Sequence, residues 1–211
     1  MSTIDTNTSL TSSVDRVPSM TITVFEREKD EFYETPPELA RPMLGLEQFE
    51  GDIWEPACGM GALSRVLSAV CENVISTDLV DRGYGVGGVD FLKEQRLRAP
   101  NIVTNPPFLL WGAFAKHALK LGARKVVLMH RQTILGNVGT SGIMEQTGLA
   151  RILLANRRVA ILPPGAIDFG HSPRGGSYAW YVWERGHVGD PTAKWFSPER
   201  APSRRREGSA L

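Results

Sequence analysis

The sequence predicts one α/β domain with an open, mostly parallel sheet. Two stretches have the pattern of a buried strand that ends at a tight turn and leads into a helix: Asp52–Ser64 and Ile102–Leu121. The first turn is rich in small residues, and the second contains two prolines. At 211 residues the chain is long enough to bury a substantial core. Because ligands bind at the carboxyl ends of strands in open α/β sheets, both turns are expected to form a site.

The composition is that of a soluble, cytoplasmic protein. Hydrophobic residues make up 42% and charged residues 22% of the chain. No apolar run approaches the ~20 residues of a membrane span, and the N-terminus lacks a basic-then-apolar signal peptide. Two cysteines, Cys58 and Cys71, constitute neither a disulfide framework nor a zinc cluster. We therefore expect no membrane partner and no metal.

The charge is divided unequally along the chain. Residues 1–90 contain 6 Lys or Arg and 16 Asp or Glu, whereas residues 91–211 contain 18 and 7. The net charges of the two parts are −10 and +11. The basic part favours a polyanionic substrate such as nucleic acid, although the two parts can also neutralise each other across the fold.

Three segments divide the chain. Residues 1–22 are rich in Ser, Thr and Asn without apolar periodicity, which predicts a disordered lead. Residues 23–197 contain the strand and helix patterns of the domain, and residues 198–211 read as a basic disordered tail.

The first helix is predicted to start at Thr35, with Pro36 in its first turn. Thr at the N-cap, Pro at the first helical position and Glu three residues after the cap are typical of a helix start. Tyr33 lies just before it. On this pattern alone the segment is a well-capped helix and nothing more.

The stretch Glu55-Pro56-Ala57-Cys58-Gly59-Met60-Gly61 links a strand to a helix that is expected to run from Ala62 to about Cys71. Gly59 and Gly61 allow the backbone to approach a ligand at the start of that helix. The spacing differs from the G-x-G-x-x-G dinucleotide fingerprint. An acid at position 55 suits a cationic ligand.

Two further acids follow strands or turns. Asp78 ends the predicted strand Asn73–Asp78, about 20 residues after the glycine turn, where a carboxylate can accept both ribose hydroxyls of a nucleoside. Its neighbour Leu79 is expected to line the same site. Asp90 and Phe91 come after a glycine-rich segment.

The central stretch is Ile102–Phe108, a short strand that stops at Asn105-Pro106-Pro107-Phe108. The prolines cannot continue a strand ladder, and their fixed φ stiffens the turn. One amide, free backbone carbonyls and one aromatic ring on a rigid turn can grip a planar amino group. An ordinary strand-ending turn has the same local pattern.

The rest of the chain is expected to complete the sheet. Trp111–Leu121 has helical apolar periodicity, and Lys125–Met129 and Val159–Leu162 read as strands. Tyr178–Trp183 is apolar on both alternating faces, which predicts a central strand.

These motifs together resemble those of S-adenosylmethionine-dependent amino-methyltransferases, above all the N6-adenine and N4-cytosine DNA enzymes. Asn105–Phe108 is similar to their (D/N)PP(Y/F/W) motif, and Glu55–Gly61 to their (D/E)PACG-x-G loop. The motif order resembles the γ type without its large DNA-reading domain, and the resemblance covers about residues 30–186.

The resemblance implies a fold, a cofactor and a set of contacts. The fold is a Rossmann-like class I methyltransferase with a seven-stranded, mostly parallel sheet of order 3-2-1-4-5-7-6, in which strand 7 is antiparallel and strand 3 can be vestigial. The catalytic residues implied are Asn105, Pro106, Pro107 and Phe108. The residues implied to bind S-adenosylmethionine are Tyr33, Thr35, Pro36, Glu55, Ala57, Cys58, Gly59, Gly61, Asp78, Leu79, Asp90 and Phe91.

The acceptor is expected to be N6 of adenine in DNA. The alternatives are N4 of cytosine in DNA, N6 of adenine in RNA, a protein glutamine, or a nucleic-acid-binding module that keeps the cofactor pocket without turnover. The connection Ile167–Gly176 is expected to lie over the target base, with Phe169, His171 and Arg174 as substrate contacts. A long hairpin turn with Phe169 in the core is the simpler interpretation of that segment.

Overall fold

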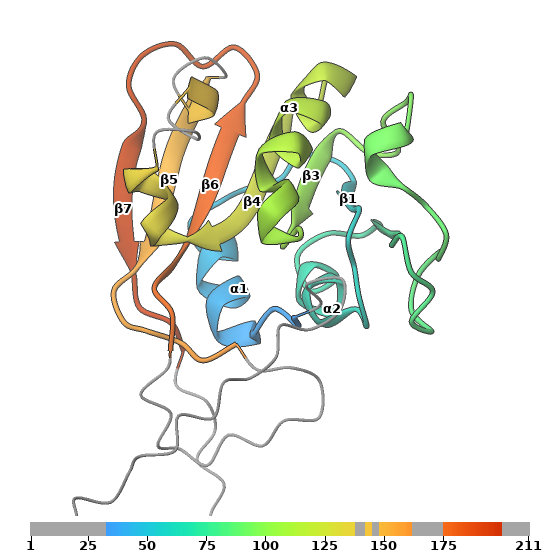
Figure 1. The fold of residues 1–211 in the computed structure, drawn as a ribbon, viewed down its shortest axis with the longest axis horizontal. Helices are drawn as coiled ribbons and strands as arrows, with labels where there is room; N and C mark the ends of the chain where they lie inside the picture. The colour runs from blue at the N-terminus through green and yellow to red at the C-terminus, as the bar shows by residue number, and fades with distance from the viewer. Residues whose placement is uncertain (1–32, 138–141, 145–147, 162–174, 200–211) are drawn as a thin grey trace, which may run out of the picture.

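A computed structural model of the chain describes residues 33–137, 142–144, 148–161 and 175–199 (Figure 1). The helices are α1 (Pro37–Leu44), α2 (Ala62–Leu67) and α3 (Trp111–Leu121), with short 3-10 helices at η2 (Phe91–Lys93), η3 (Phe108–Leu110) and η4 (Gln132–Gly136). The strands are β1 (Ile53–Glu55), β2 (Val74–Ser76), β3 (Asn101–Thr104), β4 (Lys125–Arg131), β5 (Leu149–Ala155), β6 (Tyr178–Glu184) and β7 (Thr192–Phe196). No helix among these residues combines the length and the apolarity needed to cross a membrane.

The strands form one sheet of order β2-β1-β3-β4-β6-β5-β7. β6 is antiparallel to both of its neighbours, and every other neighbouring pair is parallel. The predicted α/β fold with one antiparallel strand in a seven-stranded sheet is therefore confirmed. β6 lies between β4 and β5, so the interpretation of Tyr178–Trp183 as a central strand is also confirmed.

The seven strands differ from the seven that were expected. No strand of the described residues occupies the third position; after β2 the chain forms only an isolated bridge between Thr77 and Val86. The seventh strand is instead β7, which is parallel to β5 at the opposite edge. The glycine-rich composition of residues 83–88 explains the loss, because glycine weakens a strand.

Two local predictions are corrected. The strand expected at Val159–Leu162 is Leu149–Ala155, and Val159 forms only an isolated bridge with Gly176. The sequence of β5, rich in Leu and Ala, has the propensity of a helix, and its pairing with β6 and β7 overrides that propensity.

The helix starts also differ from expectation. Pro36, rather than Thr35, is the N-cap of α1, and no side chain caps that end. Because Pro37 excludes the residue before it from the α region, Pro36 stays extended (φ −61°, ψ 131°) and Thr35 lies outside the helix. α2 ends at Leu67, earlier than the predicted Cys71.

Helices cover both faces of the sheet, and the buried side chains alternate between them. α3 packs on one face with Ile102, Val126 and Leu128. α1 and α2 pack on the other with Val103 and Val127. The packing of helices on both faces holds the carboxyl ends of β1, β2 and β3 in fixed positions.

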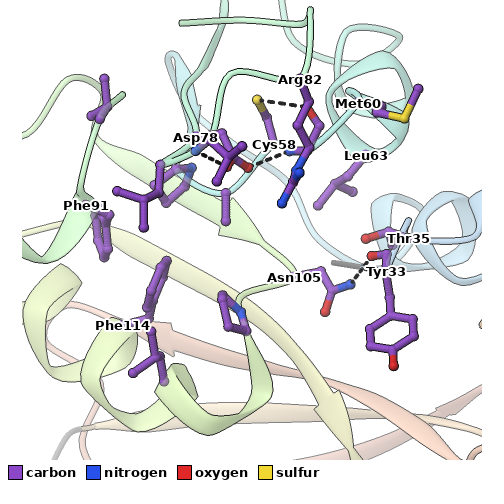
Figure 2. Close-up of a pocket in the computed structure, with 18 of the residues that line it drawn as sticks. Tyr33, Thr35, Cys58, Met60, Leu63, Asp78, Arg82, Phe91, Asn105 and Phe114 are labelled. Atoms are coloured by element: carbon purple, nitrogen blue, oxygen red, sulfur yellow. Dashed lines mark hydrogen bonds between the residues drawn. The ribbon is translucent and has the colours of Figure 1, made fainter. Parts of the chain in front are cut away.

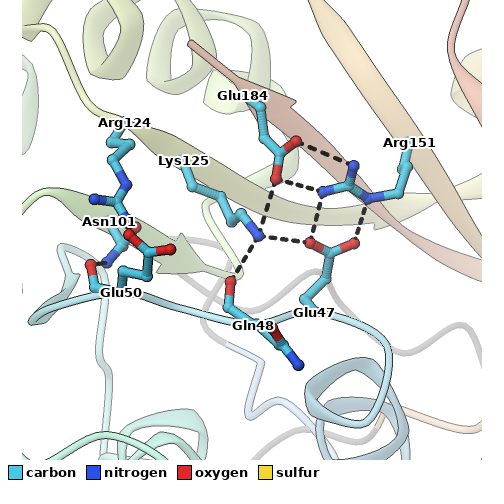
Figure 3. A network of polar contacts seen from close by, with 8 residues as sticks. All are labelled: Glu47, Gln48, Glu50, Asn101, Arg124, Lys125, Arg151 and Glu184. Carbon is cyan, nitrogen blue, oxygen red and sulfur yellow. Dashed lines mark hydrogen bonds and ion pairs between the residues drawn. The ribbon is translucent and has the colours of Figure 1, made fainter.

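An ion network fastens the segment after α1 to the end of the sheet that lies opposite the carboxyl ends of β1, β2 and β3 (Figure 3). The Glu47 carboxylate, 1% exposed, accepts hydrogen bonds from Arg151 Nε and Nη2 at 2.5 and 2.8 Å and from Lys125 Nζ at 2.9 Å. Glu184 on β6 accepts from Arg151 Nη2 at 2.6 Å and lies 3.0 Å from Lys125 Nζ. Two cations and two anions thus alternate, which satisfies each buried charge.

The network lowers the pKa of both carboxyls. Burial alone would raise the pKa of Glu47, but the hydrogen bonds from Arg151 and Lys125 outweigh it and the pKa is lowered. The hydrogen bond from Arg151 lowers the pKa of Glu184 to about 2. The network therefore stabilises the fold above the ordinary Glu pKa of 4.5 and loses this contribution as the pH falls toward 2.

Arg151→Met is expected to lower the free energy of unfolding at pH 7 by about 3 kcal/mol, because it leaves Glu47 buried with one partner fewer. Denaturant titrations from pH 7 to pH 2 measure this difference, which should shrink as the pH falls. The matched control is Arg41→Met, which breaks the exposed pair with Glu199 and should cost under about 1 kcal/mol. Equal losses in the two variants would contradict a stabilising role for the network.

Candidate active site

An open pocket lies at the carboxyl ends of β1, β2 and β3, between the segment before α1 and the start of α3 (Figure 2). Its empty volume, open solvent at the mouth included, is about 830 Å³. Eleven of the predicted site residues line it: Tyr33, Thr35, Ala57, Cys58, Gly59, Asp78, Leu79, Asp90, Phe91, Asn105 and Pro107.

The other predicted residues lie elsewhere. Pro36, Glu55, Gly61, Pro106 and Phe108 are not among the lining residues. Phe169, His171 and Arg174 fall outside the described residues, so their contact with the substrate stays a prediction.

The turn after β1 brings backbone close to the pocket. Gly61, the N-cap of α2, has φ +83°, a conformation that favours glycine. A Cβ at this position would lie 2.5 Å from the ring of Tyr84, so the ring packs directly on the glycine backbone. The guanidinium of Arg65 covers that ring at 4.7 Å from its centroid.

Asp78 joins the two loops that border the pocket. Its Oδ2 accepts the Gly59 N–H at 2.8 Å, and its Oδ1 accepts the Val80 N–H at 2.9 Å. Each oxygen keeps a lone pair, so the oriented carboxylate can accept two further hydrogen bonds, as a ribose would require.

The thiol of Cys58 forms part of the wall. Burial, reinforced by Glu55 and Asp78, raises its pKa to about 12. The thiol is therefore neutral near pH 7 and does not act as a nucleophile.

Asp90 and Phe91 border another part of the pocket. The Asp90 carboxylate caps η2 by accepting the Leu92 N–H at 3.1 Å, and it pairs with Lys93 at 3.0 Å. The ring of Phe91 is 2% exposed and lies edge-on to Trp54, with centroids 5.2 Å apart. Phe91 is thus a core residue with one edge in the pocket, and adenine contacts by this pair remain a prediction.

Asn105 has an amide of defined orientation. Its Nδ2 donates to the Tyr33 carbonyl at 3.3 Å (Figure 2). Its Oδ1 is buried and has no hydrogen-bond partner among the described residues. Because buried polar atoms are almost always satisfied, this oxygen is available to a hydrogen-bond donor, from a ligand or from a water molecule.

A cluster of aromatic and basic side chains lies around Phe108. The ring of His130 is 4.5 Å and the ring of Tyr178 6.4 Å from that of Phe108, centroid to centroid. The Arg131 guanidinium lies 5.9 Å from the same ring. We call Phe108, His130, Arg131 and Tyr178 the Phe108 cluster.

Glu55 is placed behind the pocket rather than in it. Its carboxyl accepts a hydrogen bond from the Ser64 hydroxyl of α2, which lies 2.6 Å from the Ser76 hydroxyl of β2. Burial raises the pKa of Glu55 well above its ordinary range; the Ser64 bond opposes this rise, and Asp78 adds to it. Glu55 therefore fastens α2 to β1 and β2, and a direct contact with a ligand stays a prediction.

Sequence reasoning missed several residues of the site. Arg82 lines the pocket, and Tyr84 packs on Gly61. His130 and Arg131 reach Phe108 from the end of β4, beyond the strand expected at Lys125–Met129. Their place at the carboxyl end of a strand beside Asn105 is the signal that could have identified them. No group of three or more His, Cys, Asp or Glu among the described residues could hold a metal ion.

No protein-family model and no curated protein matches the chain in sequence. Solved structures match in fold. A protein assigned as the modification subunit of a type I restriction enzyme from Vibrio vulnificus YJ016 has a TM-score of 0.53 at 15% identity, with 82% of this chain and 48% of that chain covered. This chain thus spans about half the length of that protein.

Two RNA enzymes match similarly. A protein assigned as an RNA methyltransferase from Pyrococcus horikoshii has a TM-score of 0.53 at 15% identity over 74% of this chain and 87% of that one. The 23S rRNA methyltransferase ErmE has a TM-score of 0.52 at 17% identity over 74% and 70%. The chain has the fold of class I methyltransferases. At these identities the likeness shows the fold alone, and the pocket lies where that fold binds ligands.

Glu55→Gln is expected to stabilise the fold at pH 8 relative to the unmodified chain, since the amide still accepts from Ser64 and carries no buried charge. Because the folded-state pKa of Glu55 is raised, the unmodified chain loses stability as the pH rises from 4.5 through that pKa, whereas the variant does not. Denaturant titrations from pH 5 to pH 9 measure the difference.

The control for this substitution is Glu72→Gln on an exposed position, which should change the unfolding free energy by less than about 0.5 kcal/mol. A Glu55→Gln chain that is less stable than the unmodified one at pH 8 would mean that the fold requires the charged carboxylate.

Proposed function

We propose that the chain transfers a methyl group from S-adenosylmethionine to the exocyclic amine of a nucleobase, with N6 of adenine in DNA as the first candidate. The buried, unpartnered Oδ1 of Asn105 is the observation that carries this proposal. The Asn105 amide is oriented by its hydrogen bond to the Tyr33 carbonyl, so Oδ1 can accept from an N–H or O–H group of a substrate but not from a carboxylate.

The residues of the pocket fit the cofactor. The oriented carboxylate of Asp78 suits two vicinal hydroxyls, and the backbone at Gly59 leaves room for close approach. Of the charged residues that line the pocket, Glu34, Asp78 and Asp90 are acidic, which favours a ligand with cationic groups. When bound, S-adenosylmethionine would supply an electrophilic methyl group on a sulfonium.

The turn residues would orient the amine. An exocyclic amine is a weak nucleophile because its lone pair is delocalised into the ring. Asn105 Oδ1 can accept one N–H, and a backbone carbonyl of the turn can accept the other. The Pro107 carbonyl already accepts from Leu110 at 2.9 Å, which leaves the carbonyl of Pro106 for this role. Two acceptors draw the nitrogen toward a tetrahedral geometry and free its lone pair, so alignment and electrostatics supply the catalysis.

Asn105 carries no net charge. The amine would therefore keep its proton during transfer and release it afterwards. This order requires no general base in the transfer step.

The Phe108 cluster supports a nucleobase as the acceptor. A phenyl ring beside His130 and Arg131 offers stacking for a flat base and a cation for a phosphate. In duplex DNA the base must first leave the stack. The positive charge of residues 91–211 favours nucleic acid over a protein glutamine, whereas cytosine N4 and RNA adenine present the same amine chemistry.

Asn105→Ala is expected to lower methyl transfer by at least about 100-fold, in keeping with the loss of an oriented transition-state contact, while the dissociation constant for S-adenosylmethionine changes less than about threefold. The assay incubates the chain with labelled S-adenosylmethionine and, separately, DNA, RNA or protein, and then identifies the modified nucleoside or amino acid. Methylation by the variant at the unmodified rate would reduce the motif to a structural turn.

The rate of methyl transfer by Asn105→Asp is expected to be as low as that of Asn105→Ala. This is expected although Asp occupies this position in similar motifs. A carboxylate cannot donate to the Tyr33 carbonyl, and its oxygen would face that carbonyl at about the 3.3 Å of the present bond. The same assay, together with thermal unfolding to verify folding, measures the effect. Full activity of Asn105→Asp would show that the Tyr33 contact does not select the amide.

A further inference from the structure

Arg82 is the only positively charged side chain among the described residues that line the pocket. The other charged lining residues are the acids Glu34, Asp78 and Asp90. A single cation among acids needs a reason, because the acids alone would suit a ligand that carries only positive charge. The position of Arg82 within the pocket supplies one.

The loop between β2 and η2 directs Arg82 inward. Its two ends are tied together, since the Asp78 N–H donates to the Val86 carbonyl at 3.0 Å and the Val86 N–H to the Ser76 carbonyl at 2.9 Å. Beside Arg82 the carboxylate of Asp81 accepts the Gly83 N–H at 3.0 Å and forms a tight turn.

Two close approaches fix the shape of this loop. A Cβ at Gly85 would lie 2.5 Å from the Ser76 carbonyl oxygen, and one at Gly87 would lie 2.5 Å from the Asp81 Cβ. Both positions therefore require glycine. The backbone of the loop that carries Arg82 is therefore packed against β2 and against itself.

The side chain extends toward the part of the pocket that contains Leu63 and Asn105, away from Phe91 (Figure 2). Its Nε is buried. Much of the surrounding wall is apolar or neutral, with Met60, Leu63 and the thiol of Cys58. The planar fork of a guanidinium matches a carboxylate and forms charge-assisted hydrogen bonds with it.

We propose that Arg82 binds the α-carboxylate at the methionine end of S-adenosylmethionine. This assignment rests on the proposed function, in which Asp78 takes the nucleoside end of the same ligand. The pocket then offers an acid for the ribose hydroxyls and, on the side away from Phe91, a cation for the carboxylate. Arg82 would thereby set the orientation of the bound ligand in the pocket.

The test compares two ligands that differ only in this carboxylate, S-adenosylmethionine and decarboxylated S-adenosylmethionine. Isothermal titration calorimetry gives both dissociation constants for the full chain and for Arg82→Met. The full chain should bind S-adenosylmethionine more tightly than the decarboxylated form. Arg82→Met should weaken S-adenosylmethionine by roughly 10- to 100-fold, the range for a hydrogen bond to a charged group, and the decarboxylated form by less than about threefold.

Arg96→Met, at an exposed position outside the lining, removes the same charge and should leave both constants unchanged. Equal affinity of the full chain for the two ligands would overturn the assignment even if Arg82→Met failed to fold. Parallel weakening of both ligands in Arg82→Met would also overturn it, since Arg82 would then only shape the pocket. A full chain that binds neither ligand would overturn the proposed function itself, and this assignment with it.

Discussion

The hydrogen bond from the Asn105 amide to the Tyr33 carbonyl decides which atom of this side chain can meet a ligand. An amide that donates on one side must present its oxygen on the other. The bond exists only if the segment before α1 stays against the turn after β3. α1 is held to the sheet by the Trp180 indole N–H, which donates to the Leu39 carbonyl at 2.9 Å. Glu47 fastens the segment after the helix to Lys125 and Arg151.

The ion network and the candidate site therefore both depend on the position of α1, although they lie at opposite ends of the strands. A buried ion pair is a poor source of stability compared with apolar packing. It does, however, fix position, because each carboxylate oxygen of Glu47 has one geometry in which its partners are satisfied. The Asn105 amide keeps its orientation only if α1 stays in place. The buried charges help to hold α1 there, although they contribute little net stability.

The sequence predicted those parts of the fold whose cause is local. Prolines and glycines end β1 and β3 by their own backbone restrictions, so the turns at Pro56 and Pro106 could be read directly. The run of residues that is apolar on both faces identified β6 as central, and the helical period identified α3. The site followed because both turns lie at the same edge of a parallel sheet.

The parts that could not be predicted have non-local causes. Leu149–Ala155 is a strand because β6 and β7 border it, and its own residues favour a helix. β7 is mostly exposed and contains Lys and Thr, so no apolar pattern in the sequence predicts it as a strand. Glu55 was expected to face a ligand, yet its carboxyl turns to Ser64, a choice made by the helix that packs on it. Spacing along the chain gives the position of a side chain but not the direction in which it points.

The missing third strand bears on the chemistry of the pocket. In place of a strand, the chain closes after β2 through the Thr77–Val86 bridge, and the intervening loop turns back over the pocket. A strand at this position would lie at the edge of the sheet, where its side chains point to the two faces and not toward the carboxyl ends. The loop that takes the place of this strand contributes Leu79 and Arg82 to the lining of the pocket. The glycines of residues 83–88 disfavour a strand, and Gly85 and Gly87 allow the close packing of the loop from which Arg82 reaches the pocket.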